Sequence, residues 1–192
     1  MALKAAKDVK KTNYIPQANI EPGTCPARLV QIIDLGLQAQ RAFQGKEKPP
    51  ANEIMLTYEL VDEFMKDEEG NDIEDKPRWI SETLPFFGLF ADKAKSTKRY
   101  FALDPNNDHD GDFAKLIGIP CNVTVVNNSV GDKTYDNVAA VTTMRERDAA
   151  KCPDLVNPPK VFDDAITKAR RIKQFGGFDI SQLAGANEKL PA

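Results

Sequence analysis

Ile54-Met55-Leu56-Thr57-Tyr58-Glu59-Leu60 is the clearest strand signal in this sequence, because every second residue is apolar. Side chains of a strand point alternately to opposite faces, so the pattern predicts a strand with one buried face. Outward from it, further strands are expected at residues 28–38, 78–84, 121–125 and 135–142. The first of these should place Leu29, Ile33, Leu35 and Leu37 on one face, and its Gly36 predicts a bulge or bend.

A helix is expected between the third and fourth strands. Residues 91–103 are good helix formers without Gly or Pro, and Asp104-Pro105 ends them. A second short helix fits residues 113–117, with Asp112 near its start and Gly118 as its stop. Three strands, a helix and two strands follow the order of the OB fold, a small barrel that binds oligonucleotides. The expected fold class is mainly β: a five-stranded OB-type barrel with a helix between strands 3 and 4. Another small β-barrel or sandwich is the alternative.

The same pattern sets the expected domain boundaries. Residues 1–20 are interpreted as a flexible basic arm, residues 21–160 as the OB-fold domain, and residues 161–192 as a basic, loosely ordered C-terminal tail. No run of about 18 apolar residues is present and the start lacks an apolar signal stretch, so we expect a cytoplasmic protein without a membrane span. Three dispersed cysteines and a single histidine argue against a disulfide scaffold or a zinc site.

Basic and aromatic residues gather in two segments that could grip nucleic acid. One contributes Lys93, Lys95, Lys98, Arg99 and Tyr100, and the other, in the loop after the first strand, contributes Arg41, Phe43, Lys46 and Lys48. Cationic side chains pair with phosphates, and aromatic rings stack on bases. Trp79 shares a strand face with Ser81 and Thr83, which would place its ring outward. The alternative for each is a solvated helix face or a core aromatic.

Residues 62–75 form an acidic segment with eight acids and one base. It carries a charge of -7, and since the whole chain has a net charge of -3, the remainder carries +4. Glu69-Gly70-Asn71-Asp72 predicts a turn, so the acids should lie on a hairpin between the second and third strands. Such a hairpin is expected near the binding face, where it would repel phosphates or occupy the basic residues.

Signatures of catalysis are absent from the sequence. It contains no nucleophile elbow, Walker loop or Gly-x-Gly-x-x-Gly motif. Residues 106–112 resemble the start of an EF-hand loop, but position 12 would be Ile117 where a glutamate is needed. No cofactor and no metal are therefore expected, and a binding protein is favoured over an enzyme.

Several stretches resemble the single-stranded DNA-binding proteins of tailed bacteriophages. They are Ala27-Arg28-Leu29-Val30-Gln31, Leu56-Thr57-Tyr58-Glu59-Leu60, Lys76-Pro77-Arg78-Trp79-Ile80-Ser81-Glu82 and Lys93-Ala94-Lys95-Ser96-Thr97-Lys98-Arg99-Tyr100. The resemblance covers roughly residues 25–160. It implies an OB fold and a role in phage replication or recombination, in the host cytoplasm, and it adds Arg78 to the expected DNA-binding residues. Unlike the acidic tails frequent in such proteins, residues 188–192 are not acidic.

The function expected from the sequence is sequence-independent binding and protection of single-stranded DNA. Phage or host replication and recombination proteins are the further expected partners, and a homo-oligomer is left open. One alternative is a phage protein-interaction or assembly module whose basic residues bind an acidic partner. The other is a metal-dependent accessory nuclease that uses the clustered carboxylates.

Overall fold

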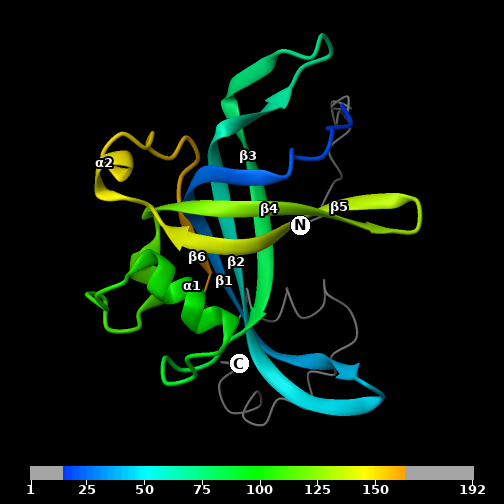
Figure 1. Ribbon diagram of the computed structural model, residues 1–192, viewed down its shortest axis with the longest axis vertical. Coiled ribbons are helices and arrows are strands. Elements are labelled where there is room, and N and C mark those ends of the chain that lie inside the picture. Colours follow the sequence, from blue (N-terminus) through cyan, green and yellow to red (C-terminus); the bar gives the residue numbers. More distant parts are fainter. Residues whose placement is uncertain (1–14, 163–192) are drawn as a thin grey trace, which may run out of the picture.

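Residues 54–60 lie at the centre of a long strand that belongs to one six-stranded sheet. The computed structural model describes residues 15–162 (Figure 1). The elements in chain order are β1 (Gly23–Phe43), β2 (Lys46–Lys66), β3 (Asp72–Pro85), α1 (Lys95–Leu103), the 3-10 helix η1 (Phe113–Leu116), β4 (Pro120–Val130), β5 (Lys133–Thr143), α2 (Glu146–Ala149) and β6 (Lys160–Phe162). The protein is thus mainly β, as predicted.

The sheet is curled but not closed by a backbone ladder between its end strands, within the described residues. Its order is β3-β2-β1-β4-β5 with antiparallel neighbours, and β6 pairs in parallel with β1 at residues 31–33. The end strands β3 and β5 nevertheless meet through side chains. The Arg78 guanidinium on β3 lies 3.5 Å from the Asp136 carboxylate on β5.

The core lies between the curled sheet and the helices that follow β3. Tyr100 and Leu103 of α1 and Phe113 and Leu116 of η1 pack against the inward residues of the strands. Each large apolar side chain buried in this way stabilises the fold by roughly 1.5–3 kcal/mol. α1 begins at Lys95, four residues later than predicted, and η1 starts as predicted, with the Asp112 side chain accepting a hydrogen bond from the Ala114 amide.

β1 does not keep the alternation predicted for it. Leu29 and Ile32 join the core cluster, whereas Ile33 and Leu35 are buried outside that cluster. The register between β1 and β2 shifts between Leu29 and Gln31. An extra residue in one strand changes which of the following side chains face inward, and this corrects the predicted face. A bend at the glycine of this strand is confirmed, because Gly36 has φ of 68° and coincides with a second register shift.

The three hairpins are longer than the sequence predicted. β1 and β2 continue to a turn at Gln44 and Gly45, so residues 40–52, expected as a loop, lie mostly in strands. In Figure 1 the β1–β2 hairpin points to the lower right, the β4–β5 hairpin to the right, and the β2–β3 hairpin to the top. The outer part of the β1–β2 hairpin is exposed on both faces. It therefore lacks the half-buried alternation by which a strand is recognised in a sequence.

The packed part of the chain extends one or two residues beyond positions 21 and 160. Ile20 is 2% exposed in the core, and the Asn19 side chain donates to Asp136, so the packed chain starts before residue 21. Beyond Met144, α2 forms and the chain returns to β1 as β6. Residues 1–14 of the predicted arm and residues 163–192 of the predicted tail lie outside the described residues. Among residues 15–162, no helix is long and apolar enough to cross a membrane.

Candidate nucleic-acid interface

The tip of the β1–β2 hairpin presents the first predicted group of basic and aromatic side chains. Arg41, Phe43, Lys46 and Lys48 are all exposed. The Lys48 Nζ lies 4.8 Å from the centroid of the Phe43 ring, which is within cation–π range. The pair places a positive charge and an aromatic face together on a protruding tip, where a phosphate and a base can be contacted at once.

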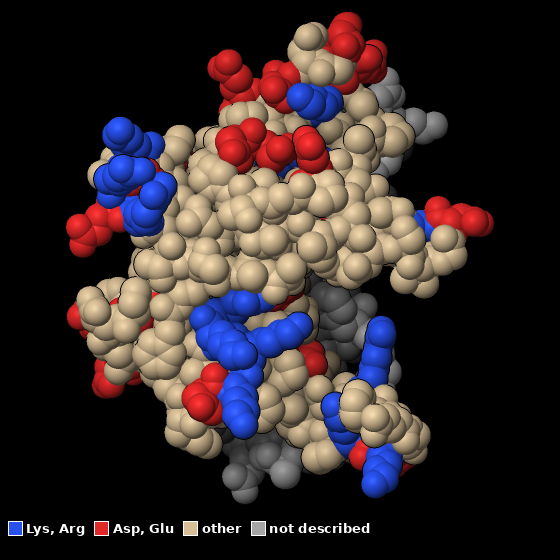
Figure 2. All heavy atoms as spheres, viewed as in Figure 1, with Lys and Arg blue, Asp and Glu red and all other residues tan. Residues whose placement is uncertain are grey.

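The structure divides the second predicted group into an exposed and a buried part. Lys93, Lys95 and Lys98 are exposed and take part in none of the ion pairs found among residues 15–162. They follow the end of β3, where Pro85 pairs with Glu53 of β2 near the β1–β2 hairpin. Figure 2 shows basic side chains around α1 and on the β1–β2 hairpin on the same face of the molecule. The two exposed groups therefore lie at the same end of the long strands.

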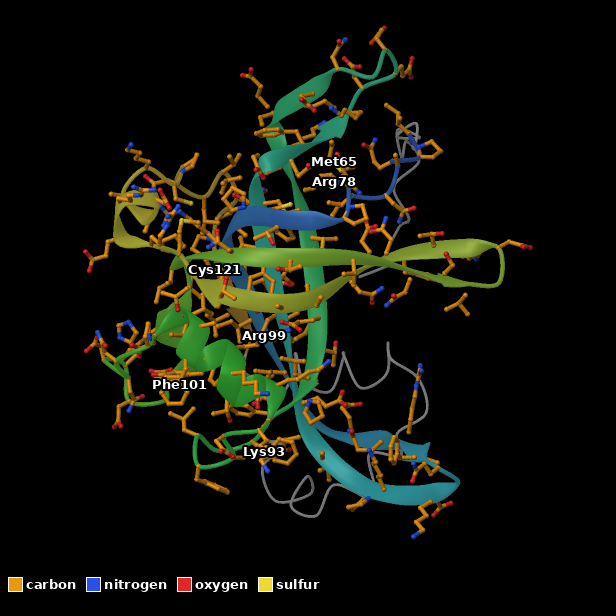
Figure 3. All side chains as sticks on the ribbon, in the orientation of Figure 1. Met65, Arg78, Lys93, Arg99, Phe101 and Cys121 are labelled. Carbon is orange, nitrogen blue, oxygen red and sulfur yellow. The ribbon has the colours of Figure 1, made fainter. Side chains whose placement is uncertain are left out.

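Arg99 and Tyr100 face the protein interior, which corrects their prediction as DNA-binding residues. Arg99 is 5% exposed, and its Nε and Nη2 atoms donate to the Glu82 carboxylate at 2.6 and 3.0 Å. Tyr100 is fully buried, and its hydroxyl donates to Asp104 Oδ2 at 2.8 Å. Figure 3 labels Arg99 between α1 and the sheet and Phe101 farther out on α1. Buried side chains cannot contact a DNA strand, so we leave both residues out of the interface.

The buried Arg99–Glu82 pair instead joins the two end strands of the sheet. Glu82 belongs to β3, and Arg99 Nη2 also donates to the Ala139 carbonyl of β5 at 3.4 Å. Burial opposes the charge on Arg99, but the hydrogen bond and negative charge of Glu82 outweigh it and raise the pKa of Arg99. The Tyr58 hydroxyl donates to Glu82 at 3.1 Å, and burial together with the Glu82 charge raises the pKa of Tyr58 well above its ordinary value.

Of the two residues predicted on β3, one is exposed and the other is paired. Trp79 is 38% exposed and faces outward as its strand parity predicts, with Ile80 buried on the opposite face. Arg78 is committed to Asp136, and its side chain is only 16% exposed. Trp79 lies six residues before Pro85, or about 20 Å along the strand. The aromatic ring is available for stacking, whereas the Arg78 guanidinium already has a carboxylate partner.

Glu59 holds Trp79 in place and was missed by the sequence analysis. This carboxylate is 1% exposed and accepts hydrogen bonds from Trp79 Nε1 at 3.0 Å and from the Val156 amide at 2.7 Å. It also accepts from the Asn157 amide at 3.3 Å and from Asn157 Nδ2 at 2.7 Å. A glutamate in an alternating strand is ordinarily expected to face solvent, so no pattern identified it.

Residues 152–162 form a strap that is anchored to the sheet at three places. Arg28 Nη2 and Nε donate to the Cys152 and Pro153 carbonyls at 2.8 and 2.6 Å. Glu59 holds the middle of the strap, and β6 holds its end against β1. The strap thus contacts the same carboxylate as the Trp79 indole, so the position of the ring depends on a segment 97 residues away from Glu59.

Further exposed aromatic and basic side chains lie near the lysines or on the β4–β5 hairpin. Phe90 is 92% exposed, Phe87 48% and Phe101 38%. On the β4–β5 hairpin, Lys133 is exposed and Tyr135 is 50% exposed. Phe87 and Phe90 were not predicted as contacts, because the short apolar run at residues 86–90 cannot be told from a core segment by composition.

The acidic hairpin lies away from the basic groups, which corrects the expectation that it occupies them. Its turn, residues 67–71, follows the end of β2 opposite to the β1–β2 turn. Figure 2 shows acidic side chains gathered at the top of the view and the basic groups around α1 and the β1–β2 hairpin in the lower half. The Asp67 carboxylate accepts from the Glu69 and Asn71 amides, so it orders its own turn.

No group of three or more His, Cys, Asp or Glu side chains among the described residues could hold a metal ion.

Comparison with known proteins adds no family: no family model matches the chain, and no curated protein matches it.

Proposed function

We propose that this protein is an OB-type barrel that binds single-stranded DNA without sequence preference and protects it during phage replication or recombination. The strand order β3-β2-β1-β4-β5, with the helix between β3 and β4, supports the OB assignment. OB folds bind oligonucleotides with the face of strands 2 and 3 and with the loops between strands 1–2 and 4–5. In this chain the two corresponding hairpins are the ones that carry exposed basic and aromatic residues.

One observation carries the proposal. Three separate segments, namely the β1–β2 hairpin, residues 86–98 and the β4–β5 hairpin, each combine an exposed aromatic ring with at least one exposed lysine. Lysines track the phosphate backbone and release counterions, while rings stack on bases of any identity. The role in replication or recombination rests on the resemblance of the sequence to bacteriophage proteins.

Removing the three exposed lysines near α1 should weaken binding and reduce its salt dependence. For the variant K93A/K95A/K98A, we expect the affinity for oligo-dT at 50 mM salt to fall roughly tenfold or more. The slope of log affinity against log salt should become shallower by up to about 2, since each lost phosphate contact contributes about 0.7. Fluorescence anisotropy over a salt series measures both quantities.

The variant K115A/R147A/K151A is the matched control, because it removes the same charge from exposed residues outside the proposed interface. It should change the slope little. Equal losses of affinity in the two variants would show that the effect comes from the net charge of the protein and not from the position of these three lysines. Absence of binding by the wild-type protein at every salt concentration would refute DNA binding itself and favour an assembly module.

Trp79 should report the bound strand directly, because it is the only tryptophan in the chain. We expect oligo-dT to quench its fluorescence. W79A should weaken binding by about 1–3 kcal/mol without changing the salt slope, whereas W79F should retain most of the affinity. Circular dichroism checks that both variants fold. Unchanged fluorescence on saturation with DNA would place Trp79 outside the contact surface.

A further inference from the structure

An open groove lies between α1 and the end of β5, next to the exposed lysines. Its volume is about 420 Å³, within the range of small-ligand sites. The lining includes Lys98 and Phe101 from α1, Val141, Thr142 and Thr143 from β5, and Asp92 from the loop before α1. Figure 3 shows Phe101 on α1 and Lys93 on the loop that leads to it.

The lining combines an aromatic wall with a cationic rim. Lys98 and Phe101 are three residues apart, so they are neighbours on one face of α1. Phe101 exposes 38% of its surface and is supported from behind by Tyr100, whose ring centroid lies 5.4 Å away in an edge-to-face arrangement. Val141, 6% exposed, adds an apolar floor. This support holds the Phe101 ring in one orientation, as a stacking surface requires.

Polar groups at the rim have distinct uses. The Thr143 hydroxyl already donates to the Ala102 carbonyl at 2.8 Å, whereas the Thr142 hydroxyl has no partner among residues 15–162 and can bond the edge of a base. Asp92 would repel a phosphate on its own side of the groove, which leaves the Lys98 side for the phosphate. A carboxylate can also accept a hydrogen bond from the exocyclic amine of a base.

We propose that this groove holds one nucleotide of the bound single strand, with its base stacked on Phe101 and its phosphate paired with Lys98. The inference rests on the proposed function and adds a specific subsite to it. The Phe101 ring beside Lys98 favours a nucleotide over an acidic peptide as the occupant, because a base can stack on the ring while its own phosphate reaches the lysine. Lys93 and Lys95 continue the basic surface out of the groove, as a backbone carrying one charge per nucleotide would need.

The variant F101L tests the subsite, because leucine keeps an apolar side chain but cannot stack on a base. We expect its affinity for oligo-dT to fall roughly 5- to 100-fold with an unchanged salt slope, and F101Y to bind nearly as the wild type does. K98A should instead reduce the slope by about 0.7. F64L makes the same chemical change on β2 near the acidic hairpin and should leave affinity unchanged. Thermal unfolding verifies that each variant is folded.

A second measurement locates the base independently of affinity. An oligonucleotide carrying 5-iodouracil should photo-cross-link to the wild-type protein within α1, as mapped by mass spectrometry. Wild-type affinity in F101L, or cross-links that avoid α1 while DNA still binds, would overturn the subsite and leave the proposed function intact. If F101L still binds DNA but no longer binds an acidic aromatic peptide that the wild-type protein binds, the groove belongs to a protein partner and the inference is overturned. If the wild-type protein binds no oligo-dT, both proposals fail together.

Discussion

R99A should lower the free energy of unfolding by about 3–5 kcal/mol, the cost of leaving a buried charge without its partner. The side chains of Arg99 and Glu82 are 6% and 9% exposed, so water cannot replace the lost guanidinium at Glu82. The substitution also removes the hydrogen bond to the Ala139 carbonyl of β5. Urea unfolding followed by the fluorescence of Trp79 measures the change as a shift of the midpoint.

Two further variants separate the missing partner from the loss of packing. E82L/R99M replaces both charges with apolar side chains and should recover most of the lost stability, because no buried charge remains. K98A, at the exposed neighbouring position, should change the free energy of unfolding by no more than about 0.5 kcal/mol. A loss below 1 kcal/mol in R99A would show that the pair is solvated in solution, and Arg99 would return to the candidate DNA contacts.

E59A should release the strap and free the Trp79 indole. Each buried donor left without an acceptor costs about 1–3 kcal/mol, and Glu59 accepts from both the indole and the strap. We expect the free energy of unfolding to fall by about 3 kcal/mol, since the more exposed donors can turn to water. Hydrogen exchange at the Val156 and Asn157 amides should accelerate, and the Trp79 emission should shift to longer wavelength.

E59Q keeps one carbonyl oxygen but turns an amide toward the donors, so its effect should be intermediate. E74A, at an exposed position of β3, should leave both the exchange rates and the emission unchanged. Protection of Val156 and Asn157 that persists in E59A would mean that Arg28 and the β6 pairing suffice to hold the strap. Glu59 would then not be needed to hold the strap against the sheet.

Local patterns sufficed for the features that depend on neighbouring residues. The alternation at residues 54–60 located β2, the glycines at positions 36 and 70 marked a bend and a turn, and Asp112 capped η1 as expected. Strand parity placed Trp79 outward. These features follow from the period of a strand or the backbone freedom of a turn, which a short window of sequence contains.

Other features depended on contacts between residues distant in the chain, and only the tertiary structure decided them. By itself the sequence determined that lysines, arginines and aromatic rings cluster after β1 and around α1. The sequence could not show that Lys98 is exposed whereas Arg99 is buried, because a charged side chain enters a core only when a partner such as Glu82 lies opposite it. In the same way, Glu59 is buried because the strap brings donors from residues 156 and 157. β2 and β3 are also long enough to place the acidic turn far from the lysines. The local alternation of apolar residues does not predict how far a hairpin extends.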